Sequence, residues 1–166
     1  NFKNKVAFVG DEFSYNSMKD IINICYISKN NIEKVDPNEF DLLWCESTWF
    51  GLDNTWKYDF THYPKHSSNI IKLVKLFKRY HKKCLFYNKE DPTNFDKFKH
   101  ICELFDIIIT TSHKCMKEYK FLYPNKLILN KPFCCNPIVH NPIKNDEIIL
   151  DCNTCNLCFL YSKFEP

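Results

Sequence analysis

Residues 84–92 have the sequence C-L-F-Y-N-K-E-D-P, an apolar run that turns polar at its midpoint. The first four residues predict a buried strand of a parallel sheet, because such strands are short apolar runs bounded by polar segments. The polar residues that follow then lie at the carboxyl end of the strand, where open α/β sheets bind their ligands. They would equally suit an ordinary polar loop in which Asp91 or Thr93 caps the next helix.

The length and composition of the chain suit one compact domain. A chain of 166 residues buries roughly 70% of its unfolded surface, so the fold needs no disulfides. The 10 cysteines lack the spacing of small secreted domains, and no signal peptide or membrane span is visible, so we expect reduced thiols in a cytoplasmic protein. A net charge of +3 does not indicate nucleic-acid binding, and two glycines exclude a glycine-rich phosphate loop.

Apolar runs alternate with amphipathic or polar segments along the chain. Strands are expected at residues 5–9, 24–27, 41–45, 84–87, 106–109 and 126–129. Helices are expected at residues 15–23, 67–83, 94–105 and 113–123. This alternation predicts a Rossmann-like, doubly wound α/β fold with a mostly parallel sheet of about six strands and helices on both faces. The prolines from Pro132 to Pro142 predict a linker that leaves the domain.

Acidic side chains follow three of the predicted strands. They are Asp11, Glu12, Glu46, Glu90 and Asp91. Because the carboxyl ends of parallel strands share one edge of a sheet, we expect Glu12, Glu46, Glu90 and Asp91 to meet in one polar cleft.

Two further segments allow two interpretations each. Residues 47–64 are aromatic and irregular, with Trp49 and Trp56 among them, and they form either a lid over the site or a set of rings that covers the sheet. The predicted helix at residues 67–83 carries six basic side chains and no acid on its outer face. That face either contacts an anionic membrane surface or a phosphate-bearing substrate, or it is simply solvated.

Six motifs in collinear order resemble the CgeB-like glycosyltransferases. They are V-A-F-V-G-D-E-F-S-Y-N at residues 6–16, C-E-S-T-W at 45–49 with Trp56 following, Y-N-K-E-D-P at 87–92, N-F-D-K-F at 94–98, F-D-I-I-I-T-T at 105–111 and K-P-F-C-C-N-P-I-V-H-N-P-I at 131–143. The resemblance implies a two-domain GT-B architecture. Residues 1–143 would be the N-terminal, acceptor-side domain, and residues 144–166 the hinge and the start of a second domain that holds the donor nucleotide.

What the resemblance implies chemically is transfer of a sugar from a nucleotide-sugar donor to a hydroxyl of a glycan, protein or polymer, with no further cofactor. Such transfer needs a carboxylate near the acceptor hydroxyl and positive groups near the leaving diphosphate. The candidate catalytic residues are therefore Glu90, Asp91, Glu46 and Glu12. The candidate substrate-binding residues are Asp11, Trp49, Trp56, Asn88, Lys89, His140 and Asn141, with Lys89 and His140 on the phosphate side. Whether the enzyme retains or inverts stays open.

Two other functions fit parts of the sequence. A non-catalytic module could recognise a glycan through Trp49 and Trp56. A receiver-like signalling domain would also place acids after its first and third strands, but here the third strand ends in Glu46 rather than in an aspartate.

The chain departs from the family after Ile143, where Cys152, Cys155 and Cys158 form C-x-x-C-x-x-C. A zinc or iron–sulfur site would need a fourth thiolate from Cys134 or Cys135. Because that fourth ligand lacks a regular spacing, we expect free thiols and no metal. The first and last residues, Asn1 and Pro166, suggest a segment of a longer protein. We expect the isolated segment to be inactive.

Overall fold

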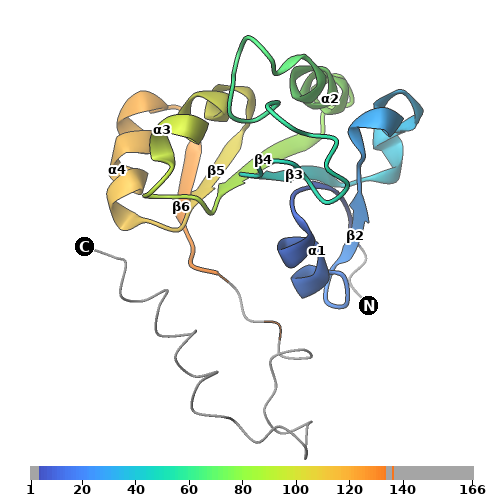
Figure 1. Cartoon of the computed structure of the whole chain (residues 1–166), viewed down its shortest axis with the longest axis horizontal. Coiled ribbons are helices and arrows are strands. Elements are labelled where there is room, and N and C mark those ends of the chain that lie inside the picture. The colour runs from blue at the N-terminus through green and yellow to red at the C-terminus, as the bar shows by residue number, and fades with distance from the viewer. Residues whose placement is uncertain (1–3, 134–135, 137–166) are drawn as a thin grey trace, which may run out of the picture. The chain divides into compact units, whose positions relative to one another are not determined.

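The computed structural model describes residues 4–133 and 136, and it contains one six-stranded parallel sheet (Figure 1). Its strands are β1 (Lys5–Val9), β2 (Asn23–Tyr26), β3 (Leu42–Glu46), β4 (Lys83–Asn88), β5 (Ile107–Thr110) and β6 (Leu127–Asn130). Each lies within two residues of its expected position. The α/β class and the six-stranded parallel sheet predicted from the sequence are therefore confirmed.

The strand order is β2-β1-β3-β4-β5-β6. The chain moves from β1 outward to β2 and then returns to the other side of β1 to form β3. In open α/β sheets, the carboxyl ends of the two strands at such a reversal form the crevice in which ligands bind. Here those strands are β1 and β3, and β4 is the next neighbour of β3.

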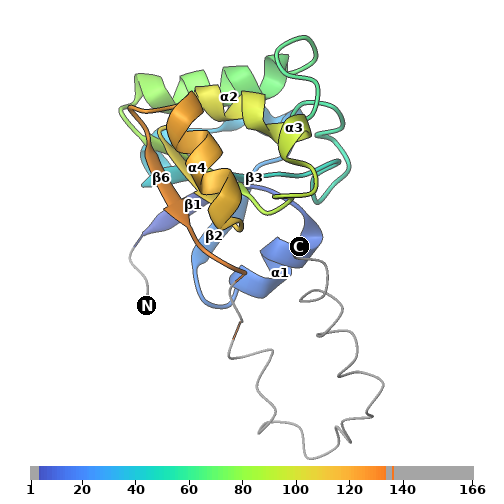
Figure 2. The same cartoon turned by 90° about the vertical axis from the view of Figure 1, so that its left-hand side faces the viewer.

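Helices lie on both faces of the sheet, but unequally. Helix α1 (Glu12–Met18) lies on one face beside β1 and β2, where its Tyr15 ring lies 6.4 Å from each of the rings of Phe8 and Tyr26. Helices α2 (Ser68–Arg79), α3 (Phe95–Phe98) and α4 (His113–Leu122) lie on the opposite face, as Figures 1 and 2 show from two directions. Among the described residues, α1 is thus the only α-helix on its face of the sheet.

This unequal cover divides the side chains of the strands into two groups. On the face of α2, α3 and α4, the side chains are fully or almost fully buried: Leu43, Cys45, Cys84, Phe86, Ile108 and Ile128. On the face of α1, the apolar side chains of β3 to β6 other than Tyr87 are half-buried or exposed: Leu42, Trp44, Leu85, Ile107, Ile109, Leu127 and Leu129. The hydrophobic core therefore lies between the sheet and the three helices of the first group.

The helices differ from their expected bounds for local reasons. Helix α1 begins at Glu12 because the Asp11 carboxylate accepts a hydrogen bond from the Ser14 amide, and it ends before β2 begins. The helix expected at 94–105 is α-helical only over Phe95–Phe98 and continues as a 3₁₀ helix over Lys99–Leu104. Helix α2 ends at Arg79, and His81 adopts a positive φ of 57° in the turn that follows.

The aromatic segment at residues 47–64 mainly covers the face of the sheet on which α2, α3 and α4 lie. Trp56 is fully buried and its Nε1 donates to the carbonyl of Ile27 at 3.1 Å. The Phe60 ring stacks on that of Phe86 at 6.2 Å. Gly51 has a φ of +78°, and a Cβ there would lie 2.7 Å from the Trp56 ring, so the turn before Trp56 requires glycine. These contacts favour the covering interpretation over a lid.

The basic face of α2 is partly neutralised. Lys72 forms an ion pair with Glu33, and Lys78 lies 3.3 Å from a carboxylate oxygen of Asp106. Both acids come from other elements, which is why the helix sequence alone suggested an unpaired basic face. None of the helices that the structure describes is long and apolar enough to cross a bilayer.

Candidate functional site

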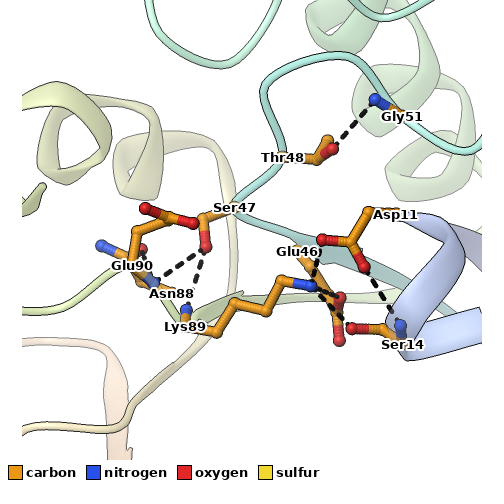
Figure 3. A network of polar contacts seen from close by, with 9 residues as sticks. All are labelled: Asp11, Ser14, Glu46, Ser47, Thr48, Gly51, Asn88, Lys89 and Glu90. Carbon is orange, nitrogen blue, oxygen red and sulfur yellow. Dashed lines mark hydrogen bonds and ion pairs between the residues drawn. The ribbon is translucent and has the colours of Figure 1, made fainter. Parts of the chain in front are cut away.

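The ammonium group of Lys89 lies at the centre of a polar cluster at the carboxyl ends of β1, β3 and β4 (Figure 3). Its Nζ lies 2.5 Å from Asp11 Oδ2, 2.7 Å from Ser14 Oγ and 3.0 Å from Glu46 Oε2. The first two contacts are hydrogen bonds that the ammonium group donates, and the third is an ion pair. We call Asp11, Ser14, Glu46 and Lys89 the Lys89 cluster.

Local backbone structure brings the members of the Lys89 cluster together. Gly10 connects β1 to α1, and a Cβ at this position would lie 2.2 Å from the Phe8 ring and 3.0 Å from Glu46 Oε2. Its lack of a side chain therefore lets the loop approach Glu46. Asp11 then caps α1 through one carboxylate oxygen and leaves the other for Lys89. One aspartate thus starts the helix and completes the ion pair.

The two carboxylates of the cluster differ in their environment. The side chain of Glu46 is 2% exposed, and its burial raises the pKa of its carboxyl, an effect that the nearby Lys89 ammonium partly offsets. The side chain of Asp11 is 40% exposed. Because Glu46 is closed off and Lys89 is only 6% exposed, Asp11 is the part of the cluster that a ligand could reach.

Ser47 connects the end of β3 to the loop that follows β4. Its Oγ accepts hydrogen bonds from the backbone amides of Lys89 at 2.9 Å and Glu90 at 3.2 Å. The Glu90 amide also lies 3.2 Å from Asn88 Oδ1. These bonds direct the two side chains apart: Figure 3 shows Lys89 extending towards α1 and Glu90 on the other side of Ser47. Glu90 is half-buried, and its Oε2 accepts from Asn94 Nδ2 at 2.6 Å.

Asp91 points into the protein rather than towards the Lys89 cluster. Its carboxylate accepts from Asn88 Nδ2 at 2.7 Å and from Thr110 Oγ1 at 2.6 Å. Asn88 Nδ2 also donates to the Tyr119 hydroxyl at 2.8 Å. Burial is the largest cause that raises the pKa of Asp91 to about 7, and the nearby Glu90 carboxylate adds to it. Asp91 and Asn88 therefore connect β4 to β5 and α4, and they stabilise the fold around the site.

The structure brings some of the sequence-predicted site residues together and not others. It gathers Asp11, Glu46 and Lys89 in one cluster, with Glu90 one residue further along. Glu12 is exposed in the first turn of α1 and takes no part in the cluster. His140 and Asn141 lie outside the described residues.

The two tryptophans that were predicted to bind substrate differ in their exposure to solvent. Trp49 is 40% exposed and its ring lies edge-on to Phe98 at 5.4 Å, so part of it could contact a ligand. Trp56 has no exposed surface on which a sugar could stack.

Sequence reasoning did not select Ser14, Ser47, Thr110 or Tyr119 as site residues. Ser47 had a usable signal, because it directly follows the acid that ends a strand. Ser14 had another, since a serine three residues after an N-cap aspartate lies in the first turn of the helix. Tyr119 had none: it lies in the middle of α4, and only the packing of α4 on β5 brings its hydroxyl to Asn88.

Among residues 4–133 and 136, no group of three or more histidine, cysteine or acidic side chains is placed to hold a metal ion. The five cysteines in that part of the chain are free thiols: Cys25, Cys45, Cys84, Cys102 and Cys115. The C-x-x-C-x-x-C run lies outside the described residues.

Comparison of the chain with protein-family models, with curated proteins and with solved structures found no match.

Proposed function

We propose that the chain is the acceptor-side domain of a glycosyltransferase that moves a sugar from a nucleotide-sugar to a hydroxyl group. The proposal is supported chiefly by the convergence of Asp11, Glu46, Lys89 and Glu90 at the point where the strand order reverses. Crevices at this point bind ligands in open α/β sheets. The resemblance to the CgeB-like family supplies the reaction class, and the strand order is compatible with it.

In this proposal Glu90 contacts the acceptor. Its backbone amide is held by Ser47, and its carboxylate is anchored at one oxygen by the neutral Asn94 amide, so the other oxygen remains to accept a proton or a hydrogen bond from a hydroxyl. The carboxylate of Asp11 is 40% exposed and is suited to accept a hydrogen bond from a neighbouring acceptor hydroxyl. Glu46 and Lys89 hold β1, β3 and β4 in register beneath them.

The donor diphosphate is assigned to groups outside the Lys89 cluster. The ammonium of Lys89 is already paired with the carboxylates of Asp11 and Glu46 and its side chain is only 6% exposed, so it is not available to neutralise a phosphate. This agrees with a donor site in a second domain, as the GT-B architecture implies. Donor and acceptor would then be aligned only when both domains are present.

The test is a transfer assay with a panel of nucleotide-sugars on the protein that carries this chain together with a second domain. Glu90→Gln should lower turnover at least roughly a hundredfold, the usual contribution of a general base, while thermal stability changes little. Glu118→Gln, at an exposed position of α4, removes the same charge away from the site and serves as the control. Unchanged turnover in Glu90→Gln would contradict the role given to Glu90. Absence of transfer from every donor would contradict the proposed function.

A receiver-like domain is the second candidate, because the order β2-β1-β3-β4-β5 is also that of flavodoxin-like signalling domains. Phosphoryl transfer to the third strand would need an accessible carboxylate there. Glu46 is buried and paired with Lys89, which opposes this function. Incubation of the chain with acetyl phosphate, followed by mass spectrometry, distinguishes the two candidates: a receiver gains one phosphoryl group.

A further inference from the structure

A hollow lies away from the Lys89 cluster, on the face of the sheet that α2, α3 and α4 cover. It has a volume of about 440 Å³ and is lined by Tyr63, Pro64, His100, Glu103 and Tyr123. This volume falls within the range of about 300–1,000 Å³ that is typical of small-molecule sites. Tyr123 follows the last turn of α4, whose first turn is at the carboxyl end of β5, so the hollow lies towards the other edge of the sheet. It shares no residue with the Lys89 cluster.

The two aromatic walls of this pocket are held in place. Tyr63 and Tyr123 both pack against the hydrophobic core. The hydroxyl of Tyr63 donates to Glu103 Oε2 at 3.2 Å, and that of Tyr123 donates to the backbone carbonyl of Lys99 at 2.8 Å. Rings anchored at both ends lose little conformational freedom when a ligand binds, so the pocket is preorganised.

The hydrogen-bonding capacity that remains in the pocket favours a ligand with hydroxyl groups. Because both tyrosine hydroxyls already donate within the chain, only their oxygen lone pairs are left to accept. The second carboxylate oxygen of Glu103 also accepts, and the His100 imidazole can donate or accept according to its tautomer. The pocket therefore offers several acceptors beside two aromatic surfaces.

The charges around the pocket favour an uncharged ligand. Among the five described residues that line it, Glu103 carries a carboxylate, which disfavours an anion. The ammonium of Lys126 lies 5.2 Å from the centre of the Tyr123 ring and is held by the backbone carbonyls of Cys102, Glu103 and Phe105, which disfavours a second cation beside it. Sugars meet these conditions, because a pyranose ring is uncharged, donates hydrogen bonds through its hydroxyls and packs its C–H groups on aromatic faces.

We propose that this pocket binds one sugar residue of a glycan, with its ring between Tyr63 and Tyr123 and a hydroxyl donating to Glu103. The site is separate from the proposed transfer site and does not depend on transferase activity. It would let the chain hold a glycan at a distance from the carboxyl edge of the sheet. A single sugar has few atoms, so a dissociation constant on the order of millimolar is expected.

The experiment is a titration of the 166-residue chain with methyl β-glucoside, methyl β-galactoside and N-acetylglucosamine, followed by two-dimensional NMR. At least one probe should cause saturable shifts in the amide signals of His100, Glu103 and Tyr123. Glu103→Gln should weaken binding roughly tenfold, as expected for loss of a charge-assisted hydrogen bond. Tyr63→Leu should weaken it by a similar factor because it removes one aromatic wall while keeping an apolar side chain.

Matched controls are Glu118→Gln and Tyr80→Leu, which change the same residue types at exposed positions outside the pocket. Both should bind like the unchanged chain, and circular dichroism checks that all four variants are folded. Equal weakening by the controls would overturn the proposal. So would the absence of saturable shifts with every sugar, or saturable binding of guanidinium or phosphate in the pocket where the sugars do not bind. Shifts confined to Asp11 and Lys89 would place sugar binding at the transfer site and would also overturn it.

Discussion

The ammonium of Lys89 and the carboxylate of Glu46 lie 3.0 Å apart at the carboxyl ends of the neighbouring strands β4 and β3. Both side chains are almost completely buried, with exposed fractions of 6% and 2%. A buried pair of this kind is costly to break from one side, because the remaining charge has no partner. The pair therefore links the geometry of the candidate site to the stability of the fold.

Lys89→Met should destabilise the chain by about 3–5 kcal/mol, since it leaves Glu46 buried without its cation. The double variant Lys89→Met with Glu46→Gln should lose less than the sum of the two single variants, because the uncompensated charge is gone. Urea denaturation of the four proteins gives the coupling energy. Strict additivity would show that the pair contributes no coupling.

Asp91 should make stability depend on pH in a direction opposite to that of a carboxylate whose pKa is lowered by an ion pair. Its pKa is raised from 3.8 to about 7 in the folded chain, so the folded state holds the proton more tightly than the unfolded state. Stability is therefore greatest at or below about pH 4 and falls as pH rises towards 7, by up to about 4 kcal/mol from this group. The measurement is the unfolding free energy of the unchanged chain and of Asp91→Asn between pH 4 and pH 8.

The asparagine variant should gain stability relative to the unchanged chain as pH rises, because its amide cannot ionise. Asp36→Asn, at an exposed carboxylate outside the Asp91 network, is the control for loss of a carboxylate. Parallel pH curves for Asp91→Asn and the unchanged chain would show that Asp91 does not titrate in this range.

Two adjacent residues of β4 should respond very differently to truncation. Phe86 is fully buried and stacks on Phe105 at 5.1 Å, so Phe86→Ala should destabilise by about 3–5 kcal/mol. Leu85 is half-buried on the face of α1, so Leu85→Ala should destabilise by only about 1 kcal/mol, the typical effect of a point mutation. Thermal or urea unfolding provides the comparison. Equal losses would mean that the α1 face of the sheet is as well packed as the other.

The 166-residue chain alone should fold but should bind nucleotide-sugars weakly and transfer nothing. With only two glycines the chain has no glycine-rich phosphate loop. The ammonium of Lys89 already contacts Asp11, Ser14 and Glu46. Calorimetry with a panel of nucleotide-sugars, beside a product assay on the chain and on a version extended through a second domain, checks this. Robust transfer by the chain alone would place the donor site within these residues.

The positions of the strands could be predicted from the sequence because each strand is a short apolar run between polar segments. The parallel strands β3 and β4 also place Glu46 and Glu90 at the same edge of the sheet, whereas Glu12 lies outside the Lys89 cluster and Asp91 points into the protein. The sequence did not reveal that the two faces of the sheet differ. Runs such as C-L-F-Y in β4 and I-I-I in β5 are apolar at every position, so they carry no alternation that marks one face as more exposed.

The tertiary structure decided which partner each carboxylate has. Lys89 and Asp11 are 78 residues apart in the chain, and only the strand order and register bring them into contact. Glu90 and Asp91 are neighbours in sequence, yet Ser47 and Asn94 hold Glu90 half-buried while Asn88 and Thr110 hold Asp91 inside. A polar run shows that hydrogen-bonding groups are present. Which of them become buried support and which remain available to a ligand depends on partners contributed by distant segments.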